Sequence, residues 1–318
     1  MTIPFKKQQG GFTLLELVVV VAVLGLITNL ATEYVAMNIN QQRFETTQDR
    51  LEEIKYAIVG DDTRTANGQP DLVGFVHDMG RLPIQLSELY EEPTDCDPDT
   101  VGDQTCAASY NSVLKRTIGW RGPYISQDIV TNDGWGNGAW NYESDTDAVI
   151  VSNGMDLTAE GSCSDTSHIQ KATCESAGET WTSVRCTDGS YHDQTTCEGA
   201  GETWTALDVY EEDATSEISS IEYSVSDNIE VKYTNAIIPD TVCAEVVYVA
   251  HGTTAEAHST NTATYSQGSS TEFEFSEDIP MGRVLVQIRQ YSGACTGSVV
   301  DSTITTIYPK RSVEILKL

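Results

Sequence analysis

The pattern of apolar and polar positions along the chain shows one long apolar run near its start. Residues Phe12 to Ala31 carry a single formal charge, that of Glu16. As a helix rising about 1.5 Å per residue, this run spans roughly 30 Å, the thickness of a bilayer core. Lys6 and Lys7 precede it, and the next basic residue is Arg43. The positive-inside rule therefore predicts one membrane pass, with a cytoplasmic N-terminus and the rest of the chain exported.

The helical pattern continues beyond the apolar run. Apolar positions recur at helical spacing on one face, at Phe44, Leu51, Ile54 and Ile58. No proline interrupts residues 12–60, and Gly60 is a suitable stop. We expect one helix over residues 12–60, about 70 Å long, with its membrane part at 12–31 and a head domain packed on its second half.

After the predicted helix, the pattern of apolar and polar positions indicates shorter elements. Residues 61–80 are rich in Asp, Gly and Asn and indicate a loop with a short helical piece. Within a head domain at 61–160, alternating apolar positions predict a short antiparallel sheet: Trp140, Tyr142, Val149 and Val151. Residues 207–318 contain short alternating segments such as IEVKY, TEFEF and RVLVQI, which predict an antiparallel β-sandwich of immunoglobulin or transthyretin-like type. The expected class is α+β.

A tandem repeat separates the head from the sandwich, over residues 161–206. The segment TCESAGETWT at 173–182 recurs as TCEGAGETWT at 196–205, a period of 23 residues. Units this small cannot bury a core, so we expect disulfides to hold them together. Trp181 and Trp204 either present a surface to a sugar or protein, or fill the interior of their own units, and we favour the second.

The chain has eight cysteines, all of which follow the apolar run, as expected for disulfides on an exported segment. The pairs we expect are Cys96–Cys106, Cys163–Cys174, Cys186–Cys197 and Cys243–Cys295, although sequence alone does not fix connectivity. Zinc held by the repeat cysteines with His168 and His192 is the alternative. The chain has no Cys-x-x-Cys spacing, which favours disulfides.

Charge and motif content exclude several functions. The net charge of −30 repels nucleic acid and anionic lipid headgroups, so we expect no nucleic-acid binding. Metalloprotease, phosphate-loop and nucleophile-elbow motifs are missing from the sequence, and we do not expect an enzyme. The histidines stand in polar contexts and are expected to be solvated: His77, His168, His192, His251 and His258.

The isolated Glu16 has an explanation in the residues around it, KKQQGGFTLLELVVVVAVLGLI at 6–27. This stretch resembles the start of the type IV pilins and type II secretion pseudopilins. The resemblance implies a leader at 1–11, cleavage by a prepilin peptidase between Gly11 and Phe12, and N-methylation of Phe12. It also implies that Glu16 pairs with the Phe12 amine of a neighbouring subunit during assembly. A signal peptide fits less well, because Asn29 stands where small residues are needed, and a plain anchor leaves a carboxylate unexplained in lipid.

The head resembles that of the major pseudopilin of type II secretion systems. The matching residues are Leu82 and Pro83, Gly122 to Tyr124, Asp133 to Asn137, and Ser152 to Asp156. In that family the last loop binds calcium, which implies a site including Ser152 and Asp156, with Glu160 as the nearby carboxylate. The cysteine-rich segment interrupts the ligand pattern. A plain turn without metal is therefore the alternative, and we expect no other cofactor.

These features predict a pseudopilin-like structural subunit of a type II secretion or type IV pilus-like filament that drives protein export. Its expected partners are other pilin subunits, the prepilin peptidase and the inner-membrane assembly platform. It would sit in the inner membrane with most of its chain in the periplasm before joining the filament. The large C-terminal addition favours a special or minor subunit. The alternative is a membrane-anchored module that binds glycan or protein.

Overall fold

The structure is a computed structural model. It describes residues 14–66, 69–71, 73–94, 96, 106–136, 138, 140–144, 147–155, 159, 161–169, 171–191, 194–205, 213–225, 229–233, 241–249, 256–264, 271–275, 279–291, 293–308 and 314–317.

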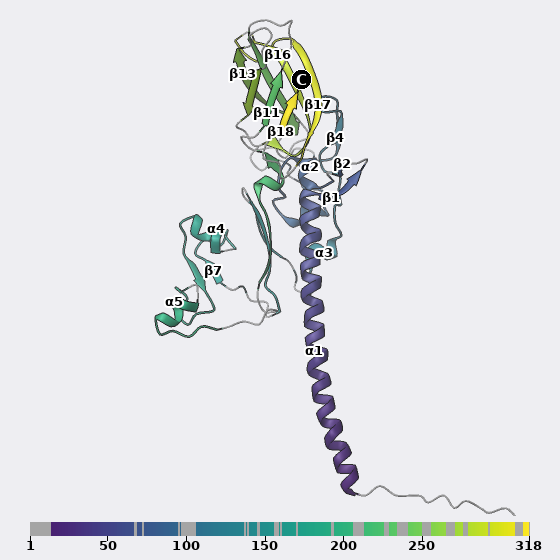
Figure 1. The fold of residues 1–318 in the computed structure, drawn as a ribbon, viewed down its shortest axis with the longest axis vertical. Helices are drawn as coiled ribbons and strands as arrows, with labels where there is room; N and C mark the ends of the chain where they lie inside the picture. Colours follow the sequence, from purple (N-terminus) through teal and green to yellow (C-terminus); the bar gives the residue numbers. More distant parts are fainter. Residues whose placement is uncertain are drawn as a thin grey trace, which may run out of the picture.

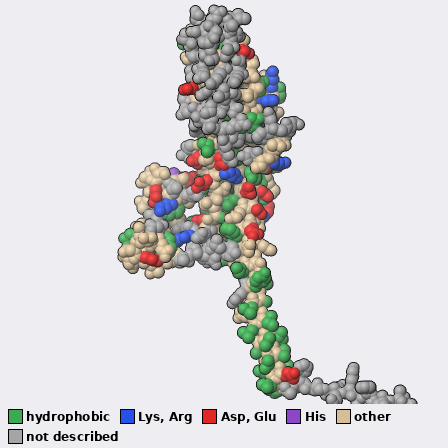
Figure 2. Space-filling model, viewed as in Figure 1, with side chains coloured by type: hydrophobic (Ala, Val, Ile, Leu, Met, Phe, Trp, Pro, Cys, Tyr) green, Lys and Arg blue, Asp and Glu red, His purple; other side chains and the backbone are tan. Residues whose placement is uncertain are grey.

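The first described element is a single long helix, α1 (Leu14–Val59), of 46 residues. It forms a rod that projects from the rest of the molecule (Figure 1). Each large apolar side chain from Leu14 to Ile39 is at least 43% exposed, and these side chains cover the projecting half of the rod (Figure 2). Among the described residues, α1 is the one helix long and apolar enough to cross a membrane. The predicted helix is confirmed over these residues.

The second half of α1 packs into the head, as its apolar spacing predicted. Leu51, Ile54 and Ile58 are at most 4% exposed and belong to the head core. The head elements in chain order are β1 (Asp61–Ala66), β2 (Gln69–Asp71), α2 (Phe75–Met79), η1 (Leu86–Leu89), β3 (Ser109–Asn111), β4 (Arg116–Ile118), α3 (Gln127–Thr131), β5 (Asn141–Ser144) and β6 (Ala148–Ser152).

The expectation of a loop over most of residues 61–80 is wrong for its first part. β1 and β2 pair as an antiparallel hairpin, with Ala66 opposite Gln69. The strands are almost wholly polar and so give no apolar alternation to detect. Their one sequence signal is the Asn67-Gly68 dipeptide between them, which is typical of two-residue hairpin connections. The short helical piece is α2.

The main head sheet is antiparallel, in the order β5-β6-β9, with β9 spanning Ala214–Ile218. All five residues of β6 are buried. β9 comes from the stretch that the sequence assigned to the C-terminal sandwich. Because β6 and β9 are direct neighbours, the cysteine-rich repeat is an insertion between two adjacent strands of the head. In Figure 1 it stands to one side of α1, away from the C-terminal sheets.

The two repeat units have the same internal structure. The first contains β7 (Gly161–Cys163), α4 (Lys171–Ser176) and β8 (Trp181–Ser183), and the second contains α5 (Gln194–Gly199). In the β7–β8 strand pair, Cys163 lies opposite Trp181. In the second unit, an antiparallel β-bridge pairs Cys186 with Trp204 in the same way. Equivalent backbone bonds recur, from Ser164 N to Thr180 O (2.9 Å) and from Thr187 N to Thr203 O (3.1 Å). The sequence period of 23 residues is therefore a structural period.

The C-terminal part consists of two sheets around one core. One has the order β13-β12-β16-β17, from Glu256–Thr264, Thr241–Val249, Gly282–Gln290 and Val299–Ile307. The other has the order β14-β11-β18, from Thr271–Phe275, Ile229–Tyr233 and Glu314–Lys317. Buried side chains of both sheets form one cluster that includes Val231, Phe273, Val246 and Val286.

Three details of this part differ from the expectation. The β11–β18 pair is parallel, whereas we expected only antiparallel pairs. β13 was missed because its sequence, EAHSTNTAT, is mostly polar. The segment IEYSV at 221–225 is divided between the 3-10 turn η2 (Ser220–Glu222) and the two-residue strand β10 (Ser224–Val225), which pairs with β15 (Ile279–Pro280).

The structure joins the cysteines as Cys96–Cys106, Cys163–Cys174, Cys186–Cys197 and Cys243–Cys295, the same pairs that the sequence analysis favoured. Because a disulfide sulfur is not a thiolate, these cysteines do not form the zinc site considered above. Each repeat unit is closed by its own disulfide.

Candidate functional site

Glu16 lies in the first turn of α1, where its side chain is exposed among the exposed apolar side chains that begin at Leu14. Gly11 and Phe12 lie outside the described residues, and so the structure does not show the expected cleavage point. A carboxylate at the start of a helix is favoured by the helix dipole. That effect does not require an apolar neighbourhood, which is the feature that singles Glu16 out.

The head is attached to α1 through the loop that follows α3. The Gly134 amide donates to Thr47 Oγ1 at 3.0 Å, and Thr47 is fully buried on the head-facing side of α1. Thr47 Oγ1 in turn donates to the Arg43 carbonyl at 2.9 Å. The Arg43 guanidinium lies 5.9 Å from the Trp135 ring centroid, a cation–π contact. The Asp-Gly-Trp stretch therefore fixes to the helix the edge of the head that lies nearest the projecting half of α1.

Replacing Gly134 by alanine should weaken this attachment. A Cβ at Gly134 would lie 2.0 Å from the Arg43 carbonyl oxygen and 2.7 Å from Thr47 Oγ1, too close for either to stay in place. We expect a loss of about 1–3 kcal/mol in the free energy of unfolding, measured by denaturant titration of the full chain in detergent. Gly138→Ala is the control, because a Cβ there meets nothing within 4 Å. Equal stability of the two variants would contradict the assigned contact.

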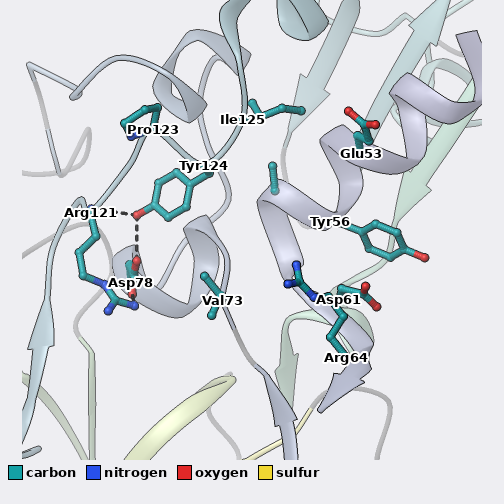
Figure 3. A pocket seen from close by; sticks show the side chains of 11 residues that line it. Glu53, Tyr56, Asp61, Arg64, Val73, Asp78, Arg121, Pro123, Tyr124 and Ile125 are labelled. Atoms are coloured by element: carbon teal, nitrogen blue, oxygen red, sulfur yellow. Dashed lines mark hydrogen bonds and ion pairs between the residues drawn. The ribbon is translucent and has the colours of Figure 1, made fainter. Parts of the chain in front are cut away.

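A polar network lies at the other edge of the head. Asp78, whose side chain is 1% exposed, pairs with Arg121 and accepts a hydrogen bond from the Tyr124 hydroxyl at 3.0 Å. Burial raises the pKa of the Asp78 carboxyl, an effect that Arg121 opposes. Figure 3 shows this network on one wall of a pocket of about 660 Å³, with Glu53 and Tyr56 of α1 on the other wall. The pocket therefore lies between the end of α1 and the loop at residues 121–125.

The first repeat unit is attached to the head by one glutamate of β5. Glu143 Oε1 lies 2.7 Å from His168 Nδ1. Its other oxygen accepts from the Ile169 amide at 3.0 Å and from Thr173 Oγ1 at 3.1 Å. The hydrogen bond to Glu143 is the main cause of a raised pKa of His168. In the second unit Tyr191 occupies the position of His168, 23 residues later.

This contact predicts a pH dependence. Since the pKa of His168 is raised in the attached state, the contribution of this contact is fully present below pH 6.5 and is lost as pH rises through the raised value. We expect the Ile169 amide to be more protected from hydrogen exchange at pH 5.5 than at pH 9, after correction for intrinsic rates. His168→Gln should abolish the difference, and the Ser190 amide of the second unit serves as the internal control. A difference that persists in His168→Gln would contradict this explanation.

Comparison with protein-family models gives one match, to the prokaryotic N-terminal methylation motif, over residues 6–28. The chain carries a prepilin-type signal. The match covers Gly11, Phe12 and Glu16, so the resemblance of the N-terminal residues to pilins and pseudopilins is confirmed. Neither the curated proteins nor the solved structures gave a match to the chain.

The prepilin-type signal together with the exposed apolar half of α1 indicates a pilin-like protein of the kind that a prepilin peptidase processes. The signal covers the start of α1 only, and the resemblance of the head to the major pseudopilin stays a prediction. The motif residues Asp133 to Gly136 have a structural role here, in the loop that fixes the head to α1.

The expected calcium residues are only partly described. Asp156 and Glu160 lie outside the described residues. Ser152 is buried and donates from Oγ to Asp133 Oδ2 at 2.7 Å, so its hydroxyl has a partner within the head. No group of three potential metal-ligating side chains occurs among the described residues. Calcium therefore stays a prediction, without support from Ser152.

The histidines differ from the expectation. His192 and His251 lie outside the described residues, and His258 is 45% exposed beside Glu245, at 2.8 Å. His77 is the clear correction, because its Nδ1 atom is buried against β16. The apolar neighbours Phe75, Val76 and Met79 indicated burial of this segment, but the covering strand comes from about 200 residues later in the chain and left no local sign.

The sequence left two roles open for the repeat tryptophans, a binding surface or the interior of their own units, and the first unit distinguishes between them for Trp181. A Cβ at Gly161 would lie 2.4 Å from Trp181 Nε1, so the indole packs directly on the backbone of its own unit. This favours the interior role for Trp181. Both tryptophans are only partly buried.

Proposed function

We propose that this protein is a minor, pseudopilin-like subunit of a type II secretion or type IV pilus-like filament. After cleavage at Gly11, α1 would anchor the subunit in the inner membrane, with the remaining domains in the periplasm, until the assembly platform moves it into the filament. The role is mechanical: it supports protein export and involves no catalytic step or cofactor.

The observation that carries this proposal is the combination of the methylation motif with an unpacked apolar helix. Side chains from Leu14 to Ile39 are exposed to a degree that a soluble protein does not tolerate. Lipid covers them before assembly, and apolar helices of other subunits would cover them afterwards. Cleavage at Gly11 would create a positive charge, the Phe12 amine, in the same low-dielectric place as Glu16, and the two groups would pair between neighbouring subunits.

The shape of the exported part supports a minor role. The insertion between β6 and β9 and the two C-terminal sheets add bulk on two different sides of the head (Figure 1). The same bulk on every protomer would crowd a filament whose subunits pack through closely spaced helices.

The experiment that tests the proposal is quantification of this chain in filaments sheared from native membranes. We expect it in the filament fraction at well below the amount of the main subunit, and absent when the prepilin peptidase gene is deleted. A chain that proved the most abundant subunit would exclude the minor role. A chain that never entered the fraction would leave the second candidate, a membrane-anchored binding module, which the side-facing insertion favours.

A further inference from the structure

The C-terminal sheets are seated on the head by a small apolar interface. Leu114 and Ile118 of the β3–β4 hairpin are fully buried against Val247 of β12 and Leu285 of β16. The Met281 amide donates to the Tyr223 carbonyl at 2.8 Å, and the Met281 side chain belongs to the head core. The two parts are therefore docked on each other.

Beside this interface, the backbone of β16 covers two polar atoms of the head. A Cβ at Gly282 would lie 2.9 Å from His77 Nδ1 and 3.0 Å from Arg116 Nη1. Within the described part of the chain, both of these buried atoms are without a hydrogen-bond partner. Gly282 has φ +127°, a backbone conformation that favours glycine. The position thus requires a residue without a side chain, and the close approach leaves no space for water.

The charges around His77 are mostly positive. Arg116 of β4 is 9% exposed and donates to the His77 carbonyl. Arg121 lies on the neighbouring loop, and Arg283 of β16 reaches across to the Lys115 carbonyl at 3.3 Å. The carboxylate at this place is Asp78, which Arg121 contacts directly and Arg116 at 3.5 Å.

Neutral His77 is compatible with this arrangement, and charged His77 is not. Desolvation and the nearby guanidiniums of Arg116, Arg121 and Arg283 lower the pKa of His77 well below its ordinary value. Burial also lowers the pKa of Arg116, to about 10, which leaves that guanidinium charged at neutral pH. A proton on His77 would place a second cation beside the buried guanidinium of Arg116, with the exposed Arg121 and Arg283 guanidiniums nearby.

We propose that the head–sheet junction is an acid-sensitive latch, closed when His77 is neutral and released when His77 is protonated. Release would leave the C-terminal sheets attached by the chain but free to move relative to the head. A pilin-like subunit would then present these sheets differently in acidic and neutral surroundings. The latch belongs to the junction and does not depend on assembly into a filament.

Proton linkage gives the direction and the size of the effect of pH on docking. The undocked state takes up a proton near pH 6.5 and the docked state does not, so docking weakens as pH falls below 6.5. For one proton, the docking constant drops by up to about 30-fold between pH 7.5 and pH 5.0, the limit for a docked state that takes up no proton. The residues that perturb Asp78 all belong to the head, namely Arg121, Tyr124 and Arg116, so its raised pKa is not assigned to docking.

The test is amide hydrogen exchange of the full chain in detergent, corrected for intrinsic rates and followed in peptides that cover β3 and β4. We expect protection of these amides to fall from pH 7.5 to pH 5.0, by up to about 30-fold. His77→Gln stays neutral and should lose this dependence, whereas His168→Gln, away from the junction, should keep it.

Two results would overturn the proposal. One is an equal loss of protection in His77→Gln, which would place the titration elsewhere. The other is a loss that begins in the unsubstituted protein only below about pH 5, the range of carboxyl groups. The second criterion needs no variant, so it holds even where His77→Gln folds poorly.

Discussion

Replacing Glu16 by alanine is expected to lower the amount of this protein in the filament fraction by at least about tenfold. The carboxylate lies on an apolar surface, where an unpaired Phe12 amine of a neighbouring subunit would cost several kcal/mol. Even a loss of about 1.4 kcal/mol changes an assembly constant tenfold. The measurement is immunodetection of the chain in sheared filaments, relative to its amount in the membrane.

Two further variants make the result specific. Glu16→Gln keeps the size of the side chain and removes its charge, so it should fail as Glu16→Ala does. Leu17→Ala changes the adjacent exposed position and should assemble. Assembly of Glu16→Ala at the unsubstituted level would contradict the pairing with Phe12, and it would favour a simple membrane-anchored binding module.

The second large effect is a loss of stability that we expect when Arg81 is replaced by alanine. Its side chain is 1% exposed, and its Nη1 atom donates to Glu88 Oε2 at 2.8 Å and to the Leu82 carbonyl at 2.8 Å. Burial already raises the pKa of Glu88 while Arg81 opposes the shift. Arg81→Ala would leave a buried carboxylate without its cation, and we expect the free energy of unfolding to fall by about 3–5 kcal/mol. Denaturant unfolding followed by tryptophan fluorescence measures this.

The controls separate burial from charge. Lys171→Ala removes one member of an exposed pair, Lys171–Glu175 at 4.0 Å, and should change stability by less than about 0.5 kcal/mol. The double variant Arg81→Met with Glu88→Leu should recover much of the loss, because it removes both charges. A cost below about 1 kcal/mol for Arg81→Ala would show that the pair does not hold the head core.

The sequence predicted the features that rest on strong local patterns. The apolar face of α1 was visible because Leu51, Ile54 and Ile58 recur at helical spacing. The repeat was visible because ten residues recur with one change, and its disulfides followed from units too small to have a core. Glu16 stood out because lipid makes a single charge costly.

Polar strands and long-range contacts were not predictable in the same way. β1, β2 and β13 have few apolar residues, so they lack the alternation by which strands are detected. β9 joins the head sheet only because the chain returns to β6 after the insertion. His77 is covered by Gly282, and no local pattern relates two residues so far apart.

The most direct test of the central claim is mass spectrometry of the N-terminal peptide of the protein from native membranes. A prepilin-type subunit predicts a mature chain that begins at Phe12 and carries one added methyl group on its amine. A chain that retains Met1 to Gly11 would contradict processing by a prepilin peptidase, and with it the filament role of Glu16.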